Sequence, residues 1–409
     1  MAKKRRTAVA LAACTMTAIS VSCARPHGPV SSPTSDDNSC SSAASALCAV
    51  NGNPPGTNVM AAAMVDPSSG WVLTANGLSL TRDNGRSWRS VEPPGVTPAD
   101  VLTVQFANAT DGWVVSSSDG IRLTLDRTID GAVTWTRAQL PNGSGNQLVE
   151  AAYSYFAGSR GWIVVGRGAS ASTATGAVYV TTDAEHSFVI APIPAVTRTT
   201  FLSSEDWFTL GGSGESSVYT TQTGGKVWHR VTLPRPSGAL STIIDAISPA
   251  QTSRESNLLA VALRGHHASG LDGFAVYSTN NGAASFTLNG DVEFGAIPVG
   301  NVVVSVPDST DVIVMADQSN PAGVATYSSA DAGVHFSRAV ALAQPGQAAL
   351  ADATQVHSTS FVNTQVGWAL ALYKACFSNG PVGPADCHSN ELLFATENGG
   401  SSWSALSAP

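Results

Sequence analysis

The chain has 409 residues and a formal net charge of −8, and only 12% of its residues are charged, about half of the usual share of roughly 25%. Hydrophobic residues reach 43%, which is enough for a large core. No basic run lies in the part expected to fold, so the composition argues against nucleic acid as a partner. The polar surface must come mainly from Ser, Thr, Asn and Gly, which suit β-strands and tight turns.

Residues 1–22 predict a signal peptide, because a positive start precedes a weakly apolar stretch that ends in small residues. The positive charges are those of Lys3, Lys4, Arg5 and Arg6. The following Ser-Val-Ser-Cys23 resembles a bacterial lipobox, whose cysteine receives diacylglycerol and becomes the mature N-terminus. Ordinary signal cleavage with an incidental Cys23 is the alternative. No other stretch approaches the roughly 20 apolar residues of a spanning helix.

Residues 23–55 predict a disordered tether, since they are rich in Pro, Ser, Asp and Asn and have no periodicity. A lipid-anchored domain needs such a tether to stand clear of the membrane. We therefore expect an exported protein, held at the outer face of the cell membrane by its lipid or secreted, with its folded domain at residues 56–409.

Four cysteines remain beyond the signal and the lipobox, and an even number in an exported chain predicts disulfides. They are Cys40, Cys48, Cys376 and Cys387. Pairing within each short, loop-like span is favoured. Metal ligation is the weaker alternative because no CxxC or paired-His spacing accompanies them. No metal and no cofactor is expected.

Seven eight-residue segments share the pattern S/T-x-D-x-G-x-x-W, and we call each of them a box. They begin at Thr81, Thr128, Thr181, Thr221, Thr279, Ser329 and Thr396. The residues that carry the pattern are Asp83, Gly85, Trp88, Asp130, Trp135, Asp183, Phe188, Gly225, Trp228, Asn281, Phe286, Asp331, Gly333, Phe336, Asn398, Gly400 and Trp403. In two copies the glycine comes one place early, as Gly131 and Gly282.

The box pattern has a physical cause. An Asp or Asn side chain accepts backbone N–H bonds within its own turn, and glycine reaches positive φ without steric cost. The aromatic then begins the next strand and packs over the turn. We therefore expect each box to be a self-bracing hairpin turn with a buried aromatic.

A second signature precedes most boxes, in which an aromatic ends one strand and a Trp lies in the next. Each repeat then predicts four strands, which in the second copy are Val101–Phe106, Gly112–Ser116, Gly120–Leu125 and Thr134–Gln139. Copies five and six replace the Trp strand with 257–263 and 311–317. Four-stranded units repeated seven times predict an all-β, seven-bladed β-propeller. No strand exchange that closes the ring is evident, although residues 42–51 could add one.

The boxes resemble the Asp-box, or bacterial-neuraminidase, repeat. The chain also carries the pattern Phe…Asp-Gly-Trp-Val-Val. With both patterns, the chain from about residue 57 is most similar to the photosystem II assembly factor type of propeller. That resemblance implies a binding or assembly scaffold. Sialidases and xyloglucanases carry the same boxes, so the box names a fold element and no chemistry.

A non-enzymatic propeller is the favoured function, binding an envelope or extracellular protein, peptide or glycan through the loops of one mouth. The Arg-Ile-Pro segment of sialidases is absent, and all 9 Trp occupy repeat positions. The tyrosines at the repeat position before a box are expected in the core or on a blade face: Tyr179, Tyr219, Tyr277 and Tyr327. A glycoside hydrolase of sialidase or xyloglucanase type is the alternative, with acids among Glu150, Asp245, Asp272, Glu293 and Asp352.

Three other features of the sequence are candidates for a site. Phe377, between the two late cysteines, is the best surplus aromatic for an interaction. The pair His266-His267 is expected to be solvated loop rather than a metal site. Glu205-Asp206, which precedes Trp207, is expected to serve in a turn.

Overall fold

The computed structural model describes residues 59–141, 149–167, 175–183, 186–194, 199–211, 217–236, 243–245, 257–264, 272–294, 299–319, 322–340, 353–378 and 385–407. All of them belong to the compact unit Ser45–Pro409. The predicted signal peptide and tether, with Cys23, Cys40 and Cys48, lie outside the described residues. So do His266 and His267.

The described residues form seven four-stranded sheets. Blade 1 has β1 (Val59–Met64), β2 (Gly70–Thr74), β3 (Gly77–Thr81) and β4 (Arg89–Ser90). Blade 2 has β5 (Val101–Phe106), β6 (Gly112–Ser116), β7 (Thr124–Thr128) and β8 (Thr136–Gln139), after the short 3₁₀ helix η1 (Pro98–Asp100). Blade 3 has β9 (Val149–Ala157), β10 (Arg160–Arg167), β11 (Thr175–Thr181) and β12 (Val189–Ile193).

Blade 4 has β13 (Thr199–Phe201), β14 (Asp206–Gly211), β15 (Ser217–Gln222) and β16 (His229–Val231). Blade 5 has β17 (Ile243–Asp245), β18 (Leu258–Arg264), β19 (Gly273–Ser278) and β20 (Thr287–Glu293). Blade 6 has β21 (Val299–Ser305), β22 (Val312–Ser319), β23 (Ala322–Ser329) and β24 (Ser337–Val340). Blade 7 has β25 (Ala353–Phe361), β26 (Gly367–Ser378), β27 (Ala385–Thr396) and β28 (Ser404–Leu406).

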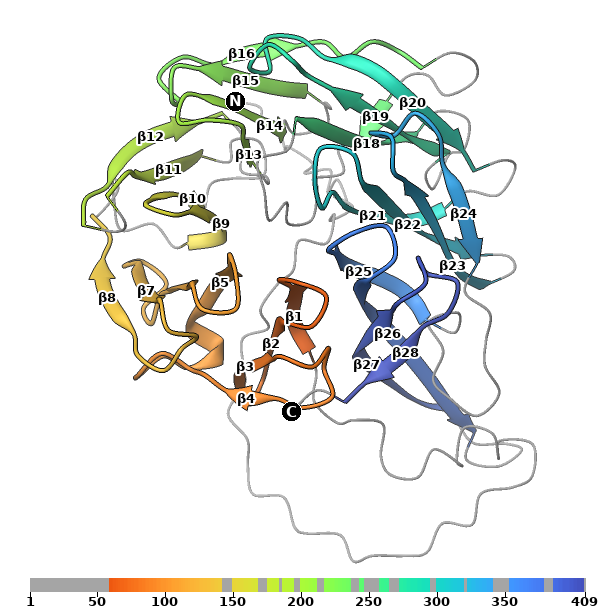
Figure 1. The fold of residues 1–409 in the computed structure, drawn as a ribbon, viewed down its shortest axis with the longest axis horizontal. Helices are drawn as coiled ribbons and strands as arrows, with labels where there is room; N and C mark the ends of the chain where they lie inside the picture. The colour runs from red at the N-terminus through yellow and green to blue at the C-terminus, as the bar shows by residue number, and fades with distance from the viewer. Residues whose placement is uncertain are drawn as a thin grey trace, which may run out of the picture. The chain divides into compact units, whose positions relative to one another are not determined.

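The predicted seven-bladed propeller is thus confirmed. In every sheet the four strands pair in chain order, and all the pairs are antiparallel, as in β1-β2-β3-β4. Figure 1 shows the first strands of the blades near the centre and the fourth strands at the periphery. Among the described residues no strand is shared between blades, and residues 42–51, which could add a strand, lie outside them.

The core is divided into seven clusters, each of which lies between two neighbouring blades. Side chains of a strand alternate between its two faces, so successive residues serve different clusters. In β2, Trp71 and Leu73 pack against blade 2, whereas Val72 packs against blade 7. A blade buries both faces, and for this reason its central strands read as continuous apolar runs.

Close packing explains why a glycine precedes the tryptophan in the second strand of most repeats. A Cβ atom added to Gly112, Gly161 or Gly367 would lie only 2.2–2.3 Å from the ring of a Phe near the end of the preceding strand. The Phe ring therefore lies where a side chain would be. The following Trp is buried to 2% exposure or less, as at Trp113 and Trp162.

In the part of the chain that the structure describes, side chains rather than a shared strand join blades 7 and 1. Trp368 packs in one cluster with Val72 and Met64, and the Ser360 hydroxyl accepts the Met64 N–H at 3.0 Å. The same kind of link recurs between blades 6 and 7, where Ser305 Oγ accepts the Phe361 N–H at 2.9 Å.

The structure corrects two strand predictions. The third strand of blade 2 is β7, Thr124–Thr128, because the Asp119 carboxylate caps a turn by accepting the N–H groups of Ile121 and Arg122. The span between Cys376 and Cys387 was expected to be loop-like. Both cysteines instead lie within strands β26 and β27.

Candidate functional site

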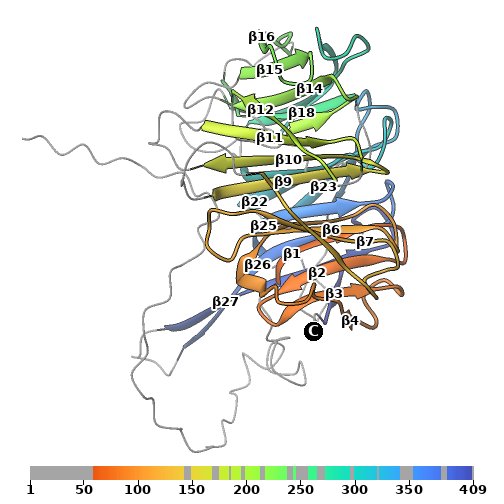
Figure 2. The ribbon, with the colours of Figure 1, turned by 90° about the vertical axis from the view of Figure 1, so that its left-hand side faces the viewer.

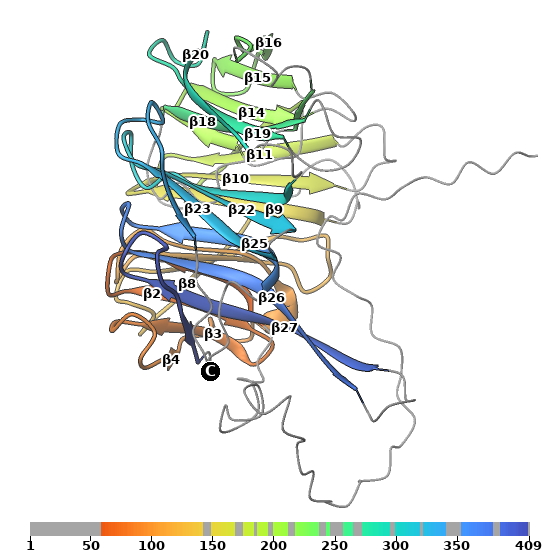
Figure 3. The ribbon, with the colours of Figure 1, turned by 90° about the vertical axis from the view of Figure 1, so that its right-hand side faces the viewer.

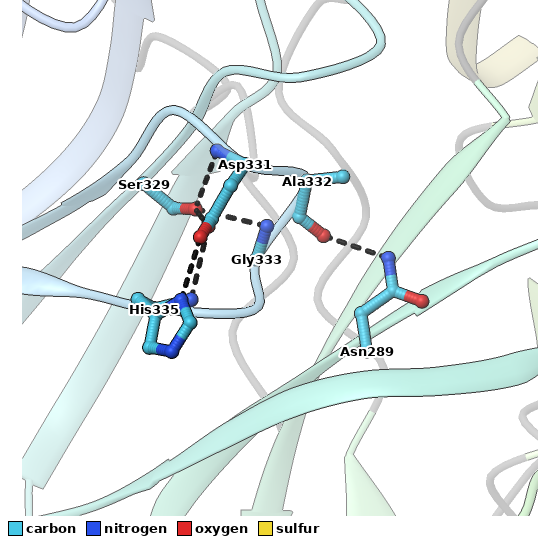
Figure 4. A network of polar contacts seen from close by, with 6 residues as sticks. All are labelled: Asn289, Ser329, Asp331, Ala332, Gly333 and His335. Carbon is cyan, nitrogen blue, oxygen red and sulfur yellow. Dashed lines mark hydrogen bonds and ion pairs between the residues drawn. The ribbon is translucent and has the colours of Figure 1, made fainter.

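Each box is a turn between the third and fourth strands, braced by its own side chains. In the first box, Thr81 Oγ1 accepts the Gly85 N–H at 2.9 Å, and Asp83 Oδ1 accepts the Ser87 N–H at 2.8 Å. Figure 4 shows the same arrangement in blade 6, where Ser329 and Asp331 accept the N–H groups of Gly333 and His335. The box carboxylates therefore serve the turn.

The boxes also fasten neighbouring blades. Asn289 of blade 5 donates its side-chain N–H to Ala332 O in the box of blade 6, at 2.7 Å (Figure 4). Within a blade, the fourth box residue donates its N–H to the turn between the first two strands, as from Gly131 to Thr110 O at 2.9 Å. The end of the ring that carries the boxes is thus occupied by structural hydrogen bonds.

The shifted glycines have a simple explanation, because both the fourth and the fifth box positions adopt positive φ. In the first box Asn84 and Gly85 have φ of 55° and 82°, and in the second Gly131 and Ala132 have 71° and 64°. A glycine at either position therefore supplies one of the two positive φ values, and Asn or Ala adopts the other.

Hydrogen bonds keep the box carboxylates ionised. The side-chain and backbone hydrogen bonds of Ser87 lower the pKa of Asp83 to about 2, and those of Thr134 do the same for Asp130. Ser187 lowers the pKa of Asp183 to about 2, and His335 lowers that of Asp331. Carboxylates of this kind are poor proton donors, so the boxes offer no general acid.

The predicted burial of the box aromatics holds for two of them and is corrected for five. Phe286 and Trp403 are 6% and 8% exposed. The partly buried ones are Trp88, Trp135, Phe188, Trp228 and Phe336. Each directly precedes a fourth strand, which has no strand beyond it, and the indole N–H groups of Trp88 and Trp228 donate to backbone carbonyls of the preceding blade.

Several other candidates from the sequence lie in the core or in turns. Tyr179, Tyr277 and Tyr327 are buried, and Tyr219 is partly buried. Asp206 accepts the Ser203 hydroxyl at 3.0 Å in a turn, as expected of the Glu205-Asp206 pair. Of the acids named for a hydrolase, Asp272 is buried and Glu293 is exposed. Glu150 and Asp245 lie in β9 and β17, and Asp352 lies outside the described residues.

Blade 7 departs from the repeat at the end opposite its box. Strands β26 and β27 have 12 residues each, whereas the second and third strands of the other blades have 5 to 8. Residues Lys374–Ser378 pair with Ala385–Ser389 beyond the last β25 partner, Tyr373. We call this two-stranded extension the arm; Figures 2 and 3 show it reaching past the other strands. Phe377 lies in it, opposite Asp386.

Three ionisable side chains meet at the base of the arm. His357 Nδ1 lies 3.0 Å from Glu391 Oε1, and both side chains are about 30% exposed, at 30% and 29%. On the side of blade 6, both carboxylate oxygens of Asp317 accept the Val356 N–H, at 3.0 and 3.2 Å. The cluster therefore joins β22 of one blade to β25 and β27 of the next.

Burial raises the pKa of Asp317, and pairing with Glu391 raises the pKa of His357. Desolvation raises the pKa of Asp317 to about 7, against the opposing effects of the Val356 N–H and His357. The hydrogen bond to Glu391 raises the pKa of His357, with a further contribution from the charge of Asp317. Perturbed groups of this kind mark candidate functional sites.

Sequence reasoning missed this cluster. Asp317 ended a predicted apolar strand, and a carboxylate at the end of such a strand was the available signal. His357 and Glu391 are 34 residues apart in the chain and carry no motif. An ion pair with a buried carboxylate was missed in the same way: Asp126, 1% exposed, lies 2.7 Å from Nε of the exposed Arg137 on the neighbouring strand.

The described residues contain no group of three or more His, Cys, Asp or Glu side chains placed to hold a metal ion. No helix within the described ranges is long and apolar enough to cross a membrane.

No protein-family model matches this chain, and no curated protein matches it. Solved structures similar to it include "YCF48 from Cyanidioschyzon merolae", 17% identical, with 78% of this chain and 94% of that chain covered at a TM-score of 0.48. "YCF48 bound to D1 peptide" is 16% identical, with 75% and 80% covered and a TM-score of 0.43. An ancestral GH74 enzyme is 14% identical, with 86% of this chain but 55% of that chain covered and a TM-score of 0.48. At these identities the similarity concerns the fold alone.

Proposed function

We propose that this protein is an exported propeller that binds another protein or peptide of the cell envelope and performs no chemistry on it. The arm of blade 7 carries the proposal. Repeat positions elsewhere in the described residues serve packing or turn bonding, whereas the arm adds strand length that the blade does not need.

The arm offers open strand edges. β25 pairs with β26 only as far as Tyr373, and β28 pairs with β27 only over Leu393–Ala395. Residues Ala385–Leu392 therefore have no strand partner on their outer side among the described residues. Such an edge presents backbone N–H and C=O groups, which an extended peptide can pair with by β-strand addition. An extended segment of the partner is accordingly the proposed occupant.

The chain is further proposed to be a divergent Asp-box propeller of the photosystem II assembly factor type. The support is the bonding of its boxes, in which Ser or Thr at the first position and Asp or Asn at the third accept the same N–H groups in copy after copy. This relation favours a scaffold over an enzyme.

A disulfide between Cys376 and Cys387 is proposed to stabilise the arm. The two residues are direct partners in the β26–β27 ladder. Partners in an antiparallel ladder have Cα atoms about 4.5–5.5 Å apart, within the range of disulfides. A two-stranded ribbon is marginally stable by itself in water, so a covalent link at this point keeps the arm ordered.

Lipidation of Cys23, with residues 23–55 as tether, is proposed to hold the propeller at the outer face of the membrane. Partitioning of the exported wild type and of Cys23→Ala between water and detergent tests it. The wild type is expected in the detergent phase and the variant in water. Equal partitioning would overturn the anchor.

Binding through the arm can be tested by shortening it. Residues 375–388 are replaced by Asn-Gly, which closes a two-residue hairpin after the Lys374–Ser389 pair. A protein that co-purifies with the full-length wild type is identified, purified and titrated against both forms. The proposal expects at least a tenfold weaker affinity with unchanged thermal unfolding. Unchanged affinity for the shortened form would refute the arm as the contact.

One observation favours the alternative, a glycoside hydrolase. Asp317, with its raised pKa, has the protonation that a general acid needs, and Glu391 belongs to the same cluster. Both oxygens of Asp317, however, accept a backbone N–H, which suits a structural role better. Assays of the purified protein on sialyl and β-glucan substrates decide. Turnover that Glu391→Gln abolishes would replace the binding proposal.

A further inference from the structure

We propose that Asp317, His357 and Glu391 form a proton-dependent latch between blades 6 and 7, which tightens their contact at mildly acidic pH and loosens it above neutral pH. The latch is independent of the proposed binding function, because it concerns the joint between two blades. Its basis is the geometry of the joint.

The first part of the latch is a side chain that reaches across the joint. Asp317 of β22 accepts the N–H of Val356 in the first strand of the next blade, and Asn301 of β21 donates to Val356 O at 2.6 Å. Blades 2 and 3 are joined in the same way by Gln105, which accepts the Phe156 N–H at 2.9 Å. Gln105 is neutral at every pH, whereas Asp317 is not. The ring therefore contains a titratable joint and a neutral joint of similar design.

The second part is the residue next to Val356. The β25–β26 register shifts between Val356 and Ser358, so His357 is the extra residue of a β-bulge. Bulges redirect a side chain and are frequent at functional sites. Here the imidazole is directed to Glu391, two strands away.

The titratable groups that face His357 are Asp317 from β22 and Glu391 from β27. β21 contributes the neutral Asn301, and β26 contributes Leu370, Ala371 and Leu372 alongside the bulge. At mildly acidic pH a neutral Asp317 and a His357–Glu391 ion pair give no net charge. Above neutral pH both Asp317 and His357 have lost a proton, which leaves two half-buried carboxylates without a counter-charge.

The sign of the effect follows from linkage. Asp317 has a folded-state pKa above its unfolded value of 3.8, so its contribution is full below pH 4 and is lost as pH rises toward about 7. His357 acts in the same direction, because its folded-state pKa is also raised. Its share is lost as pH rises above 6.5. The joint is therefore tighter at pH 5 than at pH 8.5.

Hydrogen exchange of the full-length protein at pH 5.0 to 8.5, corrected for the intrinsic rate, tests the latch. Protection of β25 is expected to fall about tenfold over this range relative to β9, which lies at the neutral joint. The decrease should be smaller in Asp317→Asn, whose amide oxygen still accepts the Val356 N–H, and smaller in His357→Gln, because each residue contributes its own share.

Two results would overturn the latch. One is a wild-type profile of β25 that parallels that of β9 across the range; this result needs no variant and holds even if a substitution impairs folding. The other is a wild-type decrease that persists in full in Asp317→Asn. Either outcome leaves the proposed binding function untouched, since affinity for a partner is not measured.

Discussion

Trp368 of blade 7 donates its indole N–H to Asn84 Oδ1 in the box of blade 1, at 2.8 Å and across 284 positions of the chain. Trp88 of the same box lies with its ring centroid 5.8 Å from that of Trp368. The first and last blades are thus joined by aromatic packing and a partly buried hydrogen bond. A shared strand is not needed, because the apolar faces of two complete blades match.

Gly70→Ala should disrupt this closure. The added Cβ would lie 2.3 Å from Trp368 Cη2 and 2.9 Å from the carbonyl of Ala63, so the indole or the strand must move. We expect a loss of about 1–3 kcal/mol in the free energy of unfolding, measured by urea denaturation. Gly300→Ala is the matched control, since nothing lies within 4 Å of its added Cβ. Equal effects of the two changes would contradict this account of closure.

Trp403→Ala and Trp88→Ala should differ in cost although both occupy the same box position. Trp403 is 8% exposed and packs in the cluster between blades 6 and 7, so its removal should cost about 3–5 kcal/mol. Trp88 is only partly buried, and a smaller loss of about 1–3 kcal/mol is expected. Denaturant midpoints of the two variants give the order. The reverse order would mean that burial does not set the cost.

Acid should weaken the boxes that contain Asp before those that contain Asn. Asp83, Asp130 and Asp183 have folded-state pKa values of about 2, below the unfolded 3.8. Their contribution is present above pH 4 and is lost as pH falls toward 2. In the box of blade 7, Asn398 accepts the Ser402 N–H at 2.9 Å and does not titrate.

Changing all three of these Asp residues to Asn should therefore move the acid-unfolding midpoint to lower pH, followed by circular dichroism between pH 5 and 2. The blade 7 box of the wild type is the internal control and should keep its hydrogen-exchange protection longest. A midpoint that does not move would show that acid unfolding begins elsewhere in the ring.

A disulfide between Cys376 and Cys387 can be detected by peptide mapping and thiol labelling. Peptide mapping of the exported protein without reduction should find Cys376 and Cys387 joined, and alkylation should label neither before reduction. Reduction should increase proteolysis within the arm while leaving the unfolding midpoint nearly unchanged, because the arm lies outside the blade cores. Labelling of both thiols in the untreated protein would contradict the disulfide.

The sequence by itself determined the repeat and therefore the architecture. In the box of Thr81–Trp88 the Thr81 and Asp83 side chains accept N–H groups within the same eight residues, and the Phe106–Trp113 pair packs around one glycine. Because these interactions are local, each copy needs similar residues at the same spacing, and the repeat is therefore visible in the sequence. Seven copies then imply seven blades, because one blade cannot bury both of its faces alone.

Only the tertiary structure decided which side chains of different repeats meet. Asp317, His357 and Glu391 come from two blades and three strands, and the bulge at His357 has no signature in sequence. The register that sets Cys376 opposite Cys387 likewise replaced an expected loop by a strand pair. Such contacts depend on the packing of neighbouring blades and on strand register, and the periodic pattern carries information about neither.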